Sequence, residues 1–399
     1  MHPRTIVRGA AVAACVVALA RPAAAQQQGE FESWQVPGWS FTPGLSIGIE
    51  RDTNVALAAP GDLAPADADS LFGIEPFGSL EFLSRRTEFS GGYHGYVRRY
   101  VEIEELNGFD HRFQAQLRHQ ASKRVLILAR SDYADVPTTD EVLLNGGLPF
   151  SRTGSQSAYI AGGVEALLTK FTSLKSKYEL SWIDFENKET VLTGGWVNGV
   201  RTDVEHRISA RASVGAEYSI RFADLNEGTR SMRFHDVGGI ASYALGPNTT
   251  LSGAAGYSHL ADLNLGETRS APYFRFGVIQ RVRTSSAGIS YERSFVPAFG
   301  FGGTNESQEL RAFVHMPIPS NRTYLQATGS WRRSVPYLAS DLELHSFLTR
   351  ATVGYALARW FRVEGFHAFS RQDTVVTGGE INRHRIGAQL VISQPMRLQ

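Results

Sequence analysis

Hydrophobic and polar residues alternate along most of the chain. One parity is apolar and the other is polar in the segments 174–182, 214–222, 274–281, 309–315 and 385–392. A period of two places these side chains on opposite faces of an extended strand. Beyond the N-terminal segment, no run approaches the 18 consecutive apolar residues that predict a transmembrane helix, and no long window has helical periodicity. The pattern predicts an all-β protein.

The links between the expected strands alternate in length. Short links lie near 85–86, 121–123, 169–170, 209–211, 246–248, 283–284, 319–321 and 358–359, and longer links include 57–68, 136–153, 187–197, 297–305 and 374–380. Counting between them gives about 18 strands, from Phe41 to Ser393. Short turns at one end and long loops at the other are typical of a transmembrane antiparallel up-and-down β-barrel. An even strand number returns both termini to the periplasmic end.

A soluble β-sandwich also alternates, so alternation alone does not distinguish the two folds. About 350 residues run without a break where one sandwich could end, and the strands of roughly 10–15 residues exceed those of globular proteins. Aromatic residues also gather toward strand ends, as at interfacial girdles: Trp182, Phe185, Tyr218, Phe222, Tyr273, Phe274, Tyr291, Tyr324, Trp331, Tyr355, Trp360 and Phe361. These features favour one closed barrel.

The first 25 residues have the features of a secretory signal peptide. Arg4 and Arg8 precede an apolar run at 9–20, and Ala23 and Ala25 form an A-x-A cleavage site. We expect residues 26–40 to be a periplasmic segment, 41–393 the outer-membrane barrel and 394–399 a C-terminal tail. The single cysteine, Cys15, lies in the signal peptide, so the mature chain is expected to have no disulfide.

Global charge and motifs exclude several functions. The formal net charge of +1 gives no indication of nucleic-acid binding. The histidines have no metal-binding spacing, and neither a cofactor nor a metal site is expected. The segment 44–48 matches G-x-S-x-G, but Ser46 lies inside an alternating strand and not on the strand-to-helix turn that a nucleophile elbow needs. We therefore expect no catalytic residues and no enzyme activity.

If the apolar parity faces lipid, the polar parity faces the lumen. Twelve basic and seven acidic side chains then point inward: Arg112, Arg118, Arg130, Lys177, Arg221, Arg275, Arg281, Arg311, Arg332, Arg350, Arg362 and Arg385, against Glu81, Glu165, Glu179, Glu217, Glu292, Glu309 and Glu364. An 18-stranded barrel is wide enough for a water-filled channel. Arginine binds carboxylates and phosphates bidentately, so this surplus indicates a channel for anionic solutes or acidic sugar polymers. The alternative is that Arg and Glu pair across neighbouring strands and stiffen the wall.

The candidate pore-lining residues are Arg221, Arg275, Arg281, Arg311, Arg332, Arg362, Lys177, Glu179, Glu217, Glu292 and Glu364. The loop 136–153 is long and carries Leu143, Leu144 and Phe150, so we expect it to fold inward as a constriction; packing among neighbouring loops is the alternative. Trp34 and Trp39 precede the barrel and could plug or anchor it, or the segment could be a disordered lead.

The second half of the chain carries a family resemblance. Its residues are Tyr291–Pro297, Trp331–Arg333, Gly354–Tyr355, Arg359–Trp360, Val363–Gly365, Arg371–Asp373, Gly378–Glu380, Arg383–Arg385 and Gln394–Arg397. With them the chain resembles the β-barrel porins encoded beside exopolysaccharide-synthesis genes, and its architecture is similar to that of alginate-export porins. The resemblance implies an outer-membrane barrel that serves polysaccharide export. One departure is the end of the chain, which lacks the aromatic residue that usually closes the last strand.

The sequence thus predicts a monomeric outer-membrane porin that passively conducts a hydrophilic, anionic substrate, with an exported exopolysaccharide as the leading candidate. Its expected partners are outer-membrane lipid, the anionic solute or polysaccharide, and periplasmic polysaccharide-synthesis or export proteins. Three alternatives remain open. They are a generic nutrient-uptake porin, a barrel enzyme acting on lipid or lipopolysaccharide, and a structural barrel whose lumen is blocked.

Overall fold

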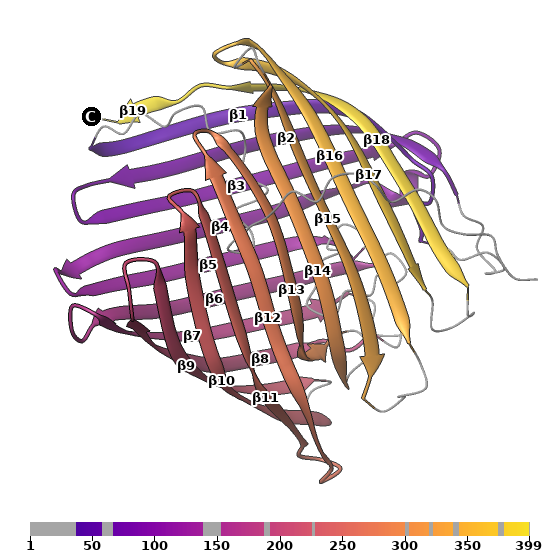
Figure 1. Ribbon diagram of the computed structural model, residues 1–399. Helices are drawn as coiled ribbons and strands as arrows, with labels where there is room; N and C mark the ends of the chain where they lie inside the picture. Colours follow the sequence, from indigo (N-terminus) through magenta and orange to yellow (C-terminus); the bar gives the residue numbers. More distant parts are fainter. Residues whose placement is uncertain are drawn as a thin grey trace, which may run out of the picture.

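Eighteen antiparallel strands close into a single barrel in the computed structural model, which describes residues 37–57, 67–138, 153–186, 192–225, 228–299, 303–318, 322–337, 343–373 and 379–398. The strands run around the wall in chain order (Figure 1). They are β1 (Gly38–Asp52), β2 (Asp69–Leu83), β3 (Thr87–Tyr100), β4 (Gly108–Ser122), β5 (Val125–Pro137), β6 (Gly154–Leu167), β7 (Thr172–Phe185), β8 (Gly195–Arg207), β9 (Ala212–Leu225), β10 (Arg230–Gly246), β11 (Thr249–Asp262), β12 (Thr268–Val282), β13 (Ser285–Ala298), β14 (Gly303–Ile318), β15 (Thr323–Pro336), β16 (Leu344–Ala358), β17 (Phe361–Asp373) and β18 (Glu380–Ser393). The predicted fold class and strand number are confirmed.

The first and last strands close the barrel. β1 pairs with β18 from Gly44 opposite Ser393 to Asp52 opposite Arg385. The links alternate as expected, with short turns such as 84–86 and 123–124 at one end and longer links such as 53–68 and 337–343 at the other. Both ends of the described chain lie at the short-turn end, and the C-terminus lies beside the start of β1 (Figure 1).

The barrel extends further at both termini than the sequence indicated. β1 begins at Gly38 and not at Phe41, so Trp39 belongs to the wall. The expected tail contains β19 (Met396–Leu398), which pairs with Trp39–Phe41 in the register of β18. The two strands are therefore one strand interrupted at Gln394 and Pro395, because proline cannot donate to a ladder.

The outer face of the barrel is apolar and exposed. Ile49, Val237, Tyr257 and Ile386 each leave more than half of their surface uncovered, and Trp182, Trp196, Tyr218 and Trp360 are also exposed there. The polar parity of the same strands points inward. Of the helices in the described residues, none is both long and apolar enough to span a membrane.

Several expectations fall on residues that the structure does not describe. The signal peptide at 1–25 and Trp34 lie outside the described residues, as do positions 139–152 of the loop 136–153.

Candidate functional site: the lumen and its constriction

The barrel encloses a cavity of ≈ 2060 Å³ that is lined by residues from every one of the eighteen barrel strands except β9, β10 and β11. Its charged lining is nearly balanced, with twelve basic and eleven acidic side chains. They are Arg112, Arg118, Arg130, Lys175, Lys177, Arg201, Arg275, Arg311, Arg350, Arg362, Arg383 and Arg385, against Glu50, Glu75, Glu81, Glu88, Asp110, Asp132, Glu165, Glu179, Asp203, Glu292 and Glu364. The basic surplus expected from the sequence is therefore absent from the described lining.

Glu217 is the centre of the best-connected group on this wall. Arg201 from β8 and Arg275 from β12 both form ion pairs with its carboxylate, the second at 2.8 Å. The Tyr273 hydroxyl donates to the same carboxylate at 2.6 Å. Tyr273 reaches across two strands because Gly238 lacks a side chain there; a Cβ atom would collide with the Tyr273 ring. One buried acid thus neutralises two luminal cations.

Other luminal charges are paired in the same way. Glu309 accepts from Arg311 at 2.5 and 2.7 Å and from Arg332 at 3.0 Å. Glu364 accepts from Arg362 at 2.5 Å and from Gln389 at 2.6 Å, and it also bonds Tyr324. Such bonds lock the side chains against the wall, as the alternative interpretation of the sequence stated.

Two further pairs lie on the seam where the barrel closes. The Arg383 guanidinium donates to both oxygens of Asp52, at 2.9 and 3.0 Å through Nε, and both side chains are buried. Arg385 pairs with Glu50 beside them, with Nη2 3.1 Å from Oε2. These contacts join β18 to β1 across the seam.

The candidate pore-lining residues take three positions. Lys177, Glu179, Arg275, Glu292, Arg311, Arg362 and Glu364 line the cavity. Glu217, Arg332 and Arg221 point inward but lie under other side chains, in ion pairs with Arg201, Glu309 and Asp236, respectively. Arg281 is exposed at the short-turn end of β12. Their role in conduction stays a prediction.

The sequence analysis missed six acids that line the cavity: Glu50, Glu75, Glu88, Asp110, Asp132 and Asp203. A signal was available, since Asp132 and Asp203 are two residues from the inward arginines that they pair with, Arg130 and Arg201. Residues two apart on a strand share a face. These acids account for most of the difference between the expected and observed charge balance.

No protein-family model matches this chain, and no curated protein matches it significantly. Among solved structures it is similar to OccAB4 of Acinetobacter baumannii, with 9% identity over 90% of this chain and 98% of that chain and a TM-score of 0.48. It is also similar to OpdQ of Pseudomonas aeruginosa, with 9% identity over 90% and 98% of the two chains and a TM-score of 0.44. Similarity at this level does not bear on what this chain transports.

At its long-loop end, the β13–β14 hairpin separates from β12 and stays paired with β15. β12 and β13 pair only as far as Phe274 opposite Arg293, whereas β13 and β14 stay paired to Ala298 opposite Gly303. Beyond the break, the Phe295 carbonyl accepts from Nη2 of the inward-facing Arg221, at 3.1 Å. The Thr304 hydroxyl contacts the Met232 sulfur on the inner face of β10. The hairpin end therefore lies inside the barrel.

Two prolines explain where the ladder stops. The backbone N–H of Arg281 donates on the side of β11, so the backbone groups of the even residues of β12 point toward β13. The Thr304 carbonyl on β14 accepts from the Tyr337 N–H, which directly follows β15, so the odd residues of β14 form their backbone bonds with β13. In the β13–β14 register these lie opposite the even residues of β13, so the backbone groups of its odd residues point toward β12. Past the Phe274–Arg293 pair, the next two hydrogen-bonded pairs would be 272 with 295 and 270 with 297, and each would need the N–H of position 272 or 297 as one of its two donors. Both positions are proline, which has no N–H to donate.

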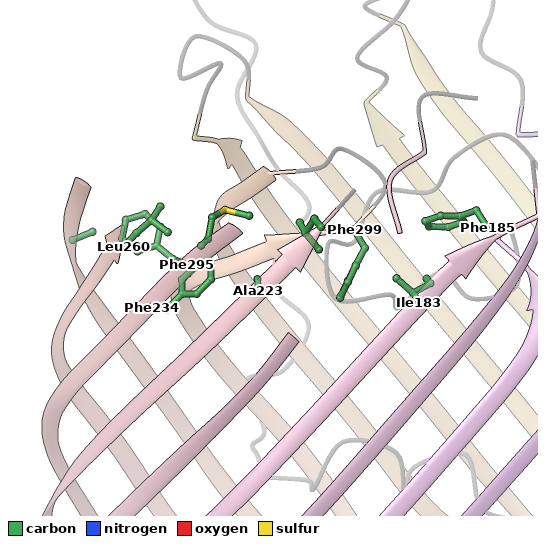
Figure 2. Close-up of a cluster of buried hydrophobic side chains, with 10 residues drawn as sticks. Ile183, Phe185, Ala223, Phe234, Leu260, Phe295 and Phe299 are labelled. Carbon is green, nitrogen blue, oxygen red and sulfur yellow. The ribbon is translucent and has the colours of Figure 1, made fainter. Parts of the chain in front are cut away.

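An apolar cluster holds the hairpin end in place. Phe295 and Phe299 join inward-facing side chains from β7, β9, β10 and β11, among them Phe234, Leu260 and Ile183. Figure 2 shows Phe234, Leu260 and Phe295 together near the long-loop ends of their strands. Phe299 and Ile183 also border the main cavity. The sequence analysis did not anticipate this inward-folded hairpin end; it expected a constriction at the loop 136–153, most of which lies outside the described residues.

An exposed ion pair links β15 to the start of β16 at the long-loop end. Arg333 donates to both oxygens of Glu343 at 2.6 Å, and these bonds hold the pKa of the Glu343 carboxyl below its usual range. A carboxyl with a lowered pKa is charged at neutral pH and loses its partner as the pH falls through that pKa. Because Glu343 is fully exposed, this link contributes little to stability.

Proposed function

We propose that this chain forms a water-filled channel across the outer membrane and conducts hydrophilic solutes passively. The observation that supports this most is the combination of an exposed apolar outer face with a charged internal cavity of ≈ 2060 Å³. A closed barrel pairs its backbone groups internally, which lipid requires, and eighteen strands leave room for water. The short-turn end would then face the periplasm.

Transport in this proposal needs no covalent step and no cofactor. A solute diffuses down its gradient, and polar side chains replace part of its hydration shell. The hairpin end around Phe295 and Phe299 would set the width, and the paired charges would present alternating signs to the solute. One chain would make one complete pore.

Substrate class is a finer part of the proposal. The balanced inner wall supports a generic diffusion channel, because most luminal arginines already have an acidic partner. The resemblance of the second half of the chain supports an anionic, exported exopolysaccharide. Lys123, Arg124, Lys170 and Arg211, in the short turns, form no ion pair with a described residue and also support an anionic substrate.

Single-channel recording tests the proposed function. Residues 26–399 would be refolded, checked for β content, and added to a planar bilayer in potassium chloride. We expect stable, stepwise conductance, and salt gradients would report ion preference through the reversal potential. A correctly folded barrel that conducts nothing would contradict the proposal and favour a blocked structural barrel or an enzyme.

A further inference from the structure

We propose that six arginines at the short-turn end bind the phosphate groups of an anionic phospholipid, phosphatidylglycerol, in the membrane leaflet that surrounds this end of the barrel. The residues are Arg85, Arg86, Arg283, Arg322, Arg359 and Arg397, and together they form the arginine arc. The inference rests on the proposed function only in that the barrel spans a membrane, and it adds a lipid partner to the channel.

The arginine arc covers one continuous side of the short-turn rim. Its members lie in the connections β2–β3, β12–β13, β14–β15 and β16–β17 and in β19. These segments follow one another around the rim, because the strands are neighbours in chain order and β19 pairs with the start of β1 (Figure 1). The described residues of these connections include no acid. This side of the rim is therefore uniformly positive.

The arginine arc lies outside the cavities through which a solute would pass. None of its members lines the main cavity. A second cavity, of ≈ 510 Å³, lies at the short-turn ends of β4 to β9, on another part of the rim. It is lined by Lys123, Arg124, Lys170 and Arg211 and by no member of the arginine arc. A solute in either cavity would contact these other cations, so the ligand of the arginine arc is expected outside the lumen.

Exposed apolar side chains accompany the arginine arc and continue the outer face of the barrel to the rim. Each leaves more than a third of its surface uncovered: Val282 beside Arg283, Ile318 near Arg322, Leu357 and Trp360 near Arg359, and Met396 and Leu398 beside Arg397. An apolar side chain next to a cation suits the boundary of a bilayer, where the first enters the hydrocarbon and the second reaches the headgroups. A water-soluble anion would leave the apolar side chains uncovered, so this mixture favours a lipid.

The charges of the arginine arc are free to meet a ligand. All six side chains are exposed, and none forms an ion pair with a residue that the structure describes. Arg397 also donates from Nη2 to the Pro37 carbonyl, at 3.3 Å. The guanidinium group presents several N–H donors in a planar fork that binds phosphate bidentately. A lipid phosphate therefore fits these residues better than a neutral headgroup.

The backbone at Arg283 supports a role for its side chain. Its φ is 54°, in the left-handed region that glycine and asparagine adopt at lower cost in a hairpin turn. An arginine at this position destabilises the turn locally, and such a cost is typical of residues that serve a function beyond the fold. Contact with a lipid headgroup is a function that the exposed side chain can perform there.

Fluorescence quenching of single tryptophans tests the lipid contact. Two variants of residues 26–399 keep one tryptophan each, with the others replaced by phenylalanine: one keeps Trp360, beside Arg359, and the other keeps Trp196, at the long-loop end of β8. Each is placed in phosphatidylcholine vesicles with an equal fraction of lipid brominated on its acyl chains, either phosphatidylglycerol or phosphatidylcholine. We expect brominated phosphatidylglycerol to quench Trp360 about twofold more strongly than brominated phosphatidylcholine, and both lipids to quench Trp196 equally. High salt should reduce the difference, because it screens exposed charges.

Matched charge variants of the protein that keeps Trp360 assign the preference to the arginine arc. Arg322→Gln and Arg359→Gln together remove the charges of two adjacent connections, one of which contains Trp360. Arg99→Gln and Arg233→Gln remove two exposed charges at the long-loop end and serve as the control. We expect the first pair to abolish the preference for phosphatidylglycerol and the control pair to keep it.

Three results would overturn the proposal. They are equal quenching of Trp360 by the two lipids, a preference that survives Arg322→Gln with Arg359→Gln, and a preference at Trp196 as large as that at Trp360. Single-channel current from the same protein tests the channel separately. Its absence from a folded barrel would contradict the channel function and leave the quenching result standing, so the two failures are distinguishable.

Discussion

At the scale of single residues, the ion preference of the lumen depends on which cations have partners. Arg201 and Arg275 share Glu217 in a low-dielectric wall, so neither presents its full charge to a solute. Counting arginines on the inward face therefore overestimates the positive potential. The quantity that matters is the number of cations left over after pairing.

Neutralising Glu217 should make the channel more anion-selective. The Glu217→Gln variant keeps the size of the side chain and removes the acidic partner of Arg275, while Arg201 keeps its pair with Asp203. We expect the anion-to-cation permeability ratio to rise about twofold, which corresponds to ~0.4 kcal/mol. The measurement is the reversal potential in a potassium chloride gradient. Glu267→Gln, in a link at the long-loop end, is the control. An unchanged ratio in Glu217→Gln would show that the wall does not set ion preference.

Residue parity and the pairs within one strand, such as Arg130 with Asp132, were predictable from the sequence, and the pairs between strands were not. Alternation placed Lys177, Arg275 and Arg362 inward, and they border the cavity. Which acid meets which arginine depends on the register between strands, which one strand's pattern does not contain. Tyr273 shows the same limit, since its reach to Glu217 requires Gly238 on a third strand.

At the scale of elements, the β13–β14 hairpin shows how two residues redirect a whole segment. The link predicted at 297–305 places the end of β13 at Val296, and the structure continues the strand to Ala298. The pattern does not show, however, how far this strand pairs with its neighbour. Pro272 on β12 and Pro297 on β13 each remove one backbone donor from the β12–β13 ladder. The apolar side chains of this segment, Phe295 and Phe299, then pack against inward-facing side chains inside the barrel.

Restoring both donors should return the hairpin to the wall. We expect the Pro272→Thr and Pro297→Thr double variant to extend the β12–β13 ladder by two hydrogen bonds, each contributing about 1 kcal/mol. The constriction would widen and the single-channel conductance would rise. Amide hydrogen exchange would show new protection at 270–272 and at 295–297. Pro76→Thr, on β2, is the control. Unchanged conductance together with new protection would mean that the hairpin is not the narrowest part.

At the scale of the whole molecule, the closure of β18 on β1 is the defining property. The strand number, the alternation of link lengths and the common side of the termini followed from the sequence, because period two and turn composition are local signals. The extra strand at 396–398 did not follow, since a three-residue strand has no pattern of its own.

The buried salt bridge between Asp52 and Arg383 should contribute more to stability than exposed salt bridges do. Asp52→Asn removes the buried carboxylate that Arg383 binds at the β1–β18 seam, at a cost of about 3–5 kcal/mol. Glu88→Gln removes the exposed, 3.8 Å pair with Arg118, worth less than about 1 kcal/mol. We expect the first variant to unfold at a clearly lower temperature and the second near the parent, in heat-modifiability gels. Equal unfolding temperatures would refute a special role for the seam.

The same seam has a kinetic consequence. Every other ladder joins strands that are neighbours in the chain and can form soon after both exist, whereas Asp52 and Arg383 are 331 positions apart. Long-range contacts form late, since chain entropy must be lost before they contribute. Until they form, β1 and β18 are open edges, ready to pair with any exposed strand. The ring is therefore most vulnerable to misassembly at the moment before it is complete, and whatever assists its biogenesis must shield that one pair of edges.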